Sequence, residues 1–310
     1  MRRCVLTSLA LALVGAAAAG GCQESGFDES RETARPLKVQ HALGDIGGTK
    51  VPGQARRPAA LTADALDDTL ALGLRPVWAS APGGRMPPHL RAQAAGIEVA
   101  PPVTKLDLAA LEATQPDLIL GSKQDQERLY PDLSRIAPTI VTDAGPAGWK
   151  LNLRLHGEAL GRTNDAERLL IDWDRRASAA RRAIGEGAGR TVAVVLVTRA
   201  GPFAAGAESF AAALLADVGL ARPASQRGPG ERVPLSAERI RTLAGDLILL
   251  AVMPGAESAA RRLQASGPWR RLPPVRAGAV QRVDAAVWWG GGGILAARAA
   301  LRDLEDVFGS

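Results

Sequence analysis

The sequence has few cysteine, histidine and aromatic side chains. Only two Cys and three His occur among its 310 residues, and aromatic residues make up 4% of the chain, although six of them are Trp. Cys4 lies in an N-terminal apolar segment that is expected to be removed, so Cys22 has no partner for an internal disulfide. His41, His89 and His156 are far apart and have no carboxylate or Cys neighbours at ligand spacing. This pattern argues against a zinc or free-metal site.

Patterns for catalysis and for nucleic-acid binding are also missing. No Ser stands in a Gly-x-Ser-x-Gly motif, and the remaining Cys has no catalytic context. The formal net charge is +6, but the Arg residues are dispersed and form no basic block interleaved with aromatics. We therefore expect no catalytic residues, no enzyme activity and no nucleic-acid partner. A mild attraction to anionic small ligands or to an anionic envelope remains open.

The N-terminus is typical of an exported protein. A Met-Arg-Arg start and the apolar run Cys4–Ala19 form a secretory signal that is too short for a good membrane span. The following Gly-Gly-Cys resembles the lipobox of bacterial lipoproteins, with Ala19 where that pattern prefers Leu. Cys22 is therefore the predicted lipid attachment site, which would anchor the protein to the cell membrane on its extracytoplasmic face. Plain export with an unused Cys22 is the alternative.

Strand and helix signals alternate on both sides of one long helical segment. Residues 163–187 carry apolar side chains at spacings of three and four, opposite a face of Arg, which predicts an amphipathic helix about 30 Å long. The alternation predicts an α/β protein of two lobes, each a parallel-type sheet flanked by helices, joined by this helix. The predicted parts are a signal peptide at 1–21, a flexible tether at 22–36, an N-terminal lobe at 37–145, a hinge and interdomain helix at 146–188, and a C-terminal lobe at 189–310.

Several segments together resemble one known family. They are Pro116–Ser122, Leu133–Thr139, Trp149–Arg154, Gly206–Phe210, Gly219–Pro223, Pro268–Trp269 and Trp288–Gly293. In this order they are similar to the substrate-binding lipoproteins of ABC importers for iron-siderophores. The resemblance implies two lobes with a ligand held between them, no catalysis, and delivery of a ferric siderophore to a membrane permease with its ATPase.

The resemblance and the ends of the predicted strands give the ligand-binding candidates. A ferric siderophore already coordinates its iron, so we expect cationic groups on ligand oxygens and indole rings on the organic shell. The candidates are Arg199, Trp288, Trp289, Lys123, Arg85, Trp78 and Trp149. Trp288 is preferred to Trp289 as the ligand wall, and a packing role stays open for Trp149. No metal ion or cofactor is expected apart from the iron-siderophore ligand.

The family resemblance also implies one surface carboxylate on each lobe for docking to the permease. Glu238 matches this position in the C-terminal lobe. In the N-terminal lobe Ala109 stands where the family has the acid, so either Asp107 or Glu112 substitutes for it or docking depends mainly on one lobe. The protein is expected to act as a monomer. Two alternative functions stay open: a haem or corrinoid receptor, in which His89 would be an axial ligand, and an envelope adaptor without a role in transport.

Overall fold

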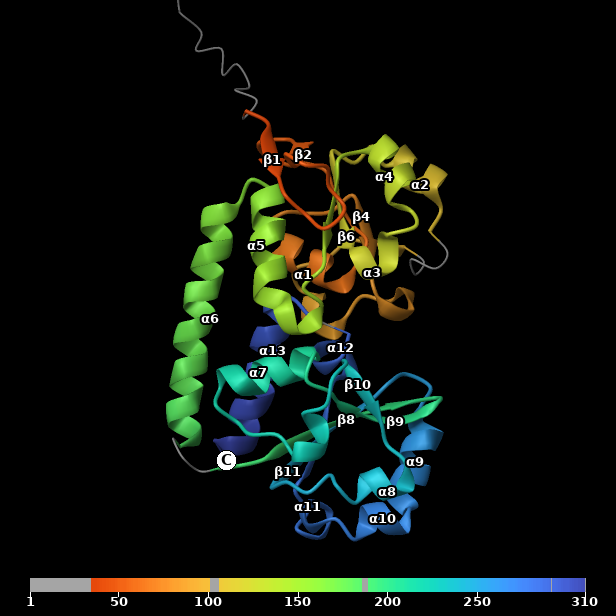
Figure 1. Ribbon diagram of the computed structural model, residues 1–310, viewed down its shortest axis with the longest axis vertical. Coiled ribbons are helices and arrows are strands. Elements are labelled where there is room, and N and C mark those ends of the chain that lie inside the picture. Colours follow the sequence, from red (N-terminus) through yellow and green to blue (C-terminus); the bar gives the residue numbers. More distant parts are fainter. Residues whose placement is uncertain (1–34, 101–105, 186–188, 291, 310) are drawn as a thin grey trace, which may run out of the picture. The chain divides into compact units, whose positions relative to one another are not determined.

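Two five-stranded sheets carry the fold, and the long helix α6 lies between them in the chain (Figure 1). The computed structural model describes residues 35–100, 106–185, 189–290 and 292–309, and these belong to one compact unit. The predicted signal peptide, Cys22 and all of the predicted tether except its last two residues lie outside the described residues. The largest cluster of buried apolar side chains includes residues of both sheets, such as Leu118 and Val194. The two halves therefore share one hydrophobic core.

The first sheet is parallel throughout, with the strand order β5-β4-β3-β6-β7. Its strands are β3 (Pro58–Ala60), β4 (Trp78–Ser80), β5 (Val99–Ala100), β6 (Leu118–Ser122) and β7 (Thr139–Thr142). The helices of this half are α1 (Ala63–Ala71), α2 (Leu108–Ala113), α3 (Lys123–Gln126), α4 (Tyr130–Ile136) and α5 (Trp149–Ala159). Strands β1 (Leu37–Val39) and β2 (Thr49–Val51) pair as a separate antiparallel ribbon. The strand order reverses between β3 and β6, which is where open α/β sheets bind ligands.

The second sheet is mixed, with the order β10-β9-β8-β11-β12. Its strands are β8 (Val192–Thr198), β9 (Gly201–Ala205), β10 (Arg232–Pro234), β11 (Leu247–Val252) and β12 (Val280–Val283). Its helices are α7 (Phe210–Asp217), α8 (Ala237–Ile240), α9 (Glu257–Ala265), α10 (Gly267–Arg270), α11 (Pro273–Arg276), α12 (Ala285–Trp288) and α13 (Ile294–Phe308). Strands β8, β11 and β12 pair in parallel, which confirms the predicted parallel-type sheet. Strands β9 and β10, which the sequence patterns did not reveal, extend it with antiparallel pairs.

Helix α6 (Thr163–Ile184) is the long segment predicted from the apolar spacing, and Figure 1 shows it in green beside α5. Its buried residues are Ala166, Leu170, Trp173, Ala177 and Ala180, which confirms the predicted apolar face. The helix ends where Gly185 adopts a positive φ of 97°. It contacts α5, α7 and α13, so it touches elements of both halves. In the described part of the chain, no helix combines the length and apolar character needed to cross a membrane.

A cluster of three aromatic rings joins α5, α6 and α7. Trp149 is fully buried, and its ring meets Trp173 edge-on at 5.3 Å and Phe210 at 6.0 Å between centroids. The indole of Trp173 donates to Asp217 at 2.8 Å, and Lys150 Nζ lies 3.0 Å from the same carboxylate. Trp149 therefore packs in the core, and the prediction that it contacts ligand does not suit this burial.

Two buried carboxylates of α1 bind the N-terminus of α13. Asp67 accepts hydrogen bonds from the backbone N–H groups of Leu295 at 2.7 Å and Ala296 at 2.9 Å. Asp68 accepts from the N–H of Ile294 at 3.3 Å. Both carboxylates are fully buried, and they satisfy amides that have no partner within the helix. This α1–α13 clamp ties the first sheet to the last helix of the chain.

We expect Gly293→Ala to disrupt the α1–α13 clamp. Gly293 has an ordinary φ of −103°, but a Cβ added there would lie 2.4 Å from the Cβ, Cγ and Oδ1 atoms of Asp67. The free energy of unfolding should fall by about 1–3 kcal/mol, as for other overpacked sites. Urea unfolding followed by circular dichroism measures this change. Gly228→Ala is the control, because nothing lies within 4 Å of its added Cβ. Equal midpoints for the two variants would contradict the expectation.

Candidate functional site

A cavity of about 870 Å³ lies at the carboxyl ends of β3, β4, β6 and β7. Each of these strands supplies one hydroxyl side chain at or just after its last residue: Thr62, Ser80, Ser122 and Thr142. The volume falls in the range of about 300–1,000 Å³ that is usual for small-molecule sites. Parallel strands point their carboxyl ends toward the same edge, so the topology itself brings these groups together.

Local hydrogen bonds hold the four hydroxyl groups in place. Thr62 and Ser122 are the N-caps of α1 and α3 and accept from Ala65 N and Asp125 N. The Ser80 hydroxyl accepts from the indole N–H of Trp78 at 3.2 Å, and the Thr142 hydroxyl donates to the Gly121 carbonyl at 3.4 Å. Ser or Thr at the end of a strand and before a helix is a normal capping signal, which is why the sequence alone does not distinguish these residues as ligand contacts.

The opposite wall of the cavity comes from the loop between α12 and α13. Trp289, Gly290 and Gly292 line the cavity there. Gly292 has a φ of 128°, in the region that favours glycine, and its backbone passes close to Asp64 of α1, with 3.5 Å from a built Cβ to that side chain. The glycines thus let this loop approach α1. The cavity is bounded by elements from both halves of the chain.

The structure corrects the choice between the two adjacent tryptophans. Trp288 is 1% exposed, lies in the main core cluster and donates from its indole to Asp303 at 2.8 Å. Trp289 is half-buried, and its indole N–H has no hydrogen-bond partner among the described residues. Trp289 therefore takes the wall position that was assigned to Trp288, because the last turn of α12 directs Trp288 to the core. Contact of Trp289 with ligand stays a prediction.

All three predicted cationic contacts lie outside the lining. Lys123 pairs with Asp143 at 3.3 Å beside the cavity, and Arg85 is exposed on the loop after β4. Arg199 lies at the exposed tip of the β8–β9 hairpin, where its guanidinium packs beside Gly255. The lining does include Arg128, which was not among the predicted contacts.

The remaining candidates also lie away from the lining. Trp78 is half-buried on β4 and packs against a side cluster of the first half. Glu238 is exposed in the first turn of α8, and Asp107 is the exposed N-cap of α2. Both carboxylates are accessible, as docking residues must be, and their role stays a prediction. Among the described residues, no group of three or more His, Cys, Asp or Glu side chains could hold a metal ion.

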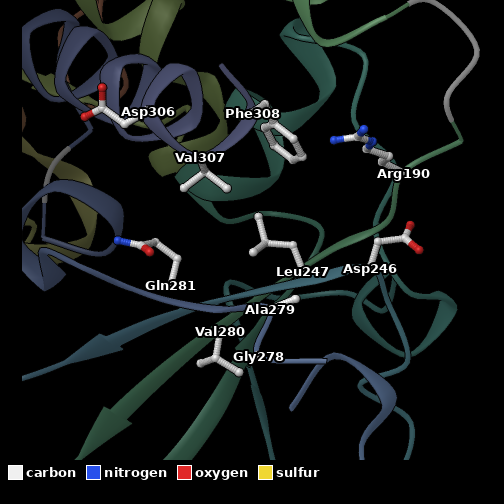
Figure 2. Close-up of a pocket in the computed structure, with 10 residues that line it drawn as sticks. All are labelled: Arg190, Asp246, Leu247, Gly278, Ala279, Val280, Gln281, Asp306, Val307 and Phe308. Atoms are coloured by element: carbon white, nitrogen blue, oxygen red, sulfur yellow. The ribbon is translucent and has the colours of Figure 1, made fainter. Parts of the chain in front are cut away.

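A second cavity, of about 670 Å³, lies at the amino ends of β8, β11 and β12 (Figure 2). Arg190, Leu247 and Val280 line it at or just before the starts of these strands, and the Arg190 guanidinium lies 5.3 Å from the centroid of the Phe308 ring. Ligands of open α/β sheets bind at the opposite, carboxyl end. We therefore take the cavity with Trp289 as the candidate site.

The three His residues have structural partners. His89 has a side chain that is 4% exposed, and its Nε2 lies 3.3 Å from Asp67, so it does not suit the alternative role of axial haem ligand. His41 lies 2.8 Å from the Thr49 hydroxyl. His156 is fully buried, with its Nδ1 2.7 Å from Asp68 Oδ2. Two of the three His thus contact the carboxylates of the α1–α13 clamp.

The Asp68–His156 pair is a buried site that titrates near neutrality. Burial raises the pKa of Asp68 to about 7, although the hydrogen bond from His156 and its charge act in the opposite direction. Burial acts to lower the pKa of His156, but the hydrogen bond and the charge of Asp68 outweigh it, so that this pKa is raised. Both directions mean that the folded pair holds a proton more firmly than the unfolded chain does.

Comparisons with known proteins agree with this architecture. The sequence pattern of the family described as periplasmic binding protein matches residues 59–287, and the chain belongs to this family. It is 28% identical to the probable siderophore-binding lipoprotein YfiY of Bacillus subtilis, over 92% of this chain and 91% of the relative. It is 28% identical to the achromobactin-binding periplasmic protein of Dickeya dadantii, over 82% and 87%. The crystal structure of Staphylococcus aureus SirA complexed with staphyloferrin B has a TM-score of 0.78 and 23% identity, over 88% of this chain and 98% of that one.

We expect the stability of the protein to fall as the pH rises from about 6.5 to 9. Above the usual pKa of His, the unfolded chain has lost the proton that the Asp68–His156 pair still holds, so folding takes up a proton. One proton corresponds to a slope of at most about 1.4 kcal/mol per pH unit. Urea unfolding at a series of pH values measures it.

Asp68→Asn is the matched variant for this measurement. It keeps an oxygen for the N–H of Ile294 and removes the charge that holds the proton on His156. Its slope between pH 6.5 and 9 should be smaller than that of the natural protein. Parallel slopes would show that this pair does not take up the proton.

Proposed function

We propose that this protein is the extracytoplasmic substrate-binding component of an ABC importer and binds a ferric siderophore in the cavity between its two halves. The observation that carries this proposal is the cavity itself. It lies at the carboxyl ends of four parallel strands and is faced by Trp289, in a chain that aligns along 92% of its length with a siderophore-binding lipoprotein. The protein acts by binding and release, without catalysis.

The lining suits the outer surface of a chelate. The hydroxyl oxygens of the lining can accept hydrogen bonds from ligand amides, while Trp289 contributes part of its indole ring to the wall. The iron is cargo that the siderophore already coordinates, so the protein needs only to recognise the organic shell and its charge. Shape and outer polar contacts then determine which chelates bind.

Delivery requires a membrane location and a surface for the permease. We propose that Cys22 carries the lipid anchor and that the monomeric protein docks to the permease through its exposed carboxylates Glu238 and Asp107. Both lie at the N-terminal ends of helices, α8 and α2, on different halves of the chain. Cationic side chains of a permease could therefore contact both halves at once.

Trp289→Phe is expected to weaken binding of a ferric siderophore about tenfold, because it removes indole area from the wall of the cavity. Titration of the protein with a panel of ferric hydroxamates and catecholates, followed by Trp fluorescence and calorimetry, measures this change. Trp269→Phe is the control: Trp269 is buried at 2% exposure in the core of the second sheet, away from the cavity. The absence of binding by the natural protein across the panel would refute the proposed function.

Cys22→Ser is expected to release the protein from the membrane fraction. Acyl chains contribute about 0.8 kcal/mol per buried methylene, so an anchor with more than one chain holds stably, whereas the Ser variant has no site for it. Fractionation of cells and mass spectrometry of the mature N-terminus measure the outcome. Retention of the variant in the membrane at the level of the natural protein would exclude lipidation at this position.

A further inference from the structure

The charged side chains that line the cavity are mostly acidic. Asp64, Asp125 and Asp143 contribute three carboxylates, and Arg128 is the one basic residue in the described lining. Asp64 is held by the Thr62 hydroxyl and lies 3.4 Å from the amide nitrogen of Asn152. Neither contact neutralises its charge. Asp143 is paired with Lys123 at 3.3 Å, so the described lining has a net charge of about −1, from Asp64 and Asp125 against Arg128.

One carboxylate of the second half is close enough to Asp125 of the lining to interact with its charge. Burial raises the pKa of Glu231, just before β10, and the carboxylates of Glu208 and Asp125 raise it further, with Arg232 acting in the opposite direction. Carboxylates of the two halves thus repel each other across this part of the molecule. A bound positive charge would relieve that repulsion, and a bound negative charge would add to it.

The predicted cations do not reverse this balance. Lys123 lies beside the lining and is engaged by Asp143 at 3.3 Å, and its side chain is 36% exposed. Arg85 and Arg199 are exposed and are absent from the lining. Asp125, Asp143 and Arg128 of the lining are exposed as well, so solvent screens their charges to a similar degree. Within the described lining, Arg128 is therefore the one guanidinium that faces an anionic chelate.

We propose that the cavity selects ferric chelates with zero or positive net charge, of the trihydroxamate kind, over polyanionic chelates. This inference rests on the proposed function. Three hydroxamates, each with one negative charge, neutralise Fe³⁺, and a free amine on the ligand then makes the complex cationic. Three catecholates, each with two negative charges, leave the complex strongly anionic. Asp125 is suited to bind an ammonium group, and Asp143 adds a second carboxylate beside it that Lys123 partly neutralises.

Direct titration of the full mature protein with three probes tests the proposal. Ferrioxamine B is a cationic trihydroxamate, ferrichrome a neutral one, and ferric enterobactin an anionic tris-catecholate. We expect the two hydroxamates to bind at least tenfold more tightly than the catecholate at low salt, with ferrioxamine B losing affinity as salt is added. Tighter binding of ferric enterobactin would overturn this inference and leave the proposed function intact. No binding of any ferric chelate would overturn both.

A pair of neutralising substitutions tests the cause. Asp125→Asn with Asp143→Asn keeps the size of the side chains and removes two charges from the lining. Affinity for ferrioxamine B should fall at least fivefold, affinity for ferrichrome should change less, and affinity for ferric enterobactin should rise. The control is Asp306→Asn, an exposed residue of the second cavity. An unchanged ratio between the cationic and anionic probes in the double variant would overturn the inference, because these carboxylates would then not set the preference.

Discussion

The arrangement of the whole site depends on two buried carboxylates. The side chains of Asp67 and Asp68 extend from α1 to the N-terminus of α13 and accept hydrogen bonds from its first backbone N–H groups. Both side chains are fully buried. Burying charge is costly unless hydrogen bonds compensate it, and here the helix N-terminus and two His side chains supply them. Because α1 begins directly after β3 and α13 follows the Trp289 loop, this contact fixes the distance between the two walls of the cavity.

The clamp also explains the glycines before α13. The backbone between Trp289 and α13 carries Gly290, Gly292 and Gly293. In the structure it passes against α1: Gly293 leaves no room for a Cβ beside Asp67, and Gly292 combines a positive φ with the approach to Asp64. The same approach brings Trp289 to the cavity. Trp289 and these glycines therefore serve both the packing of α13 against α1 and the wall of the candidate site.

The sequence predicted the elements with strong periodicity and missed those that depend on tertiary contacts. The apolar stripe of α6 and the continuous apolar runs of β8 and β11 are local signals, and both were predicted correctly. Strand β9 reads Gly-Pro-Phe-Ala-Ala and was not recognised, because its strand conformation comes from pairing with β8 and β10. The preference for Trp288 over Trp289 was wrong for a similar reason. The two residues are adjacent in the sequence, and only the orientation of the four-residue helix α12 determines which indole faces the core. The acidic lining was missed because it is assembled from separate strand ends.

The aromatic cluster of α5, α6 and α7 has a consequence for motion. It joins the two halves at a place separate from the α1–α13 clamp, and both contacts add to the hydrophobic core that the halves share. Wide opening of the halves would have to break these contacts and expose part of that core. The rate of ligand exchange should then depend on how the ligand meets the edge of the cavity and on side-chain rotamer changes, which take nanoseconds. It should not depend on a domain movement that takes milliseconds. Such a protein would have nearly the same shape with and without a bound chelate. A permease would then have to distinguish the two states by contacting the chelate itself.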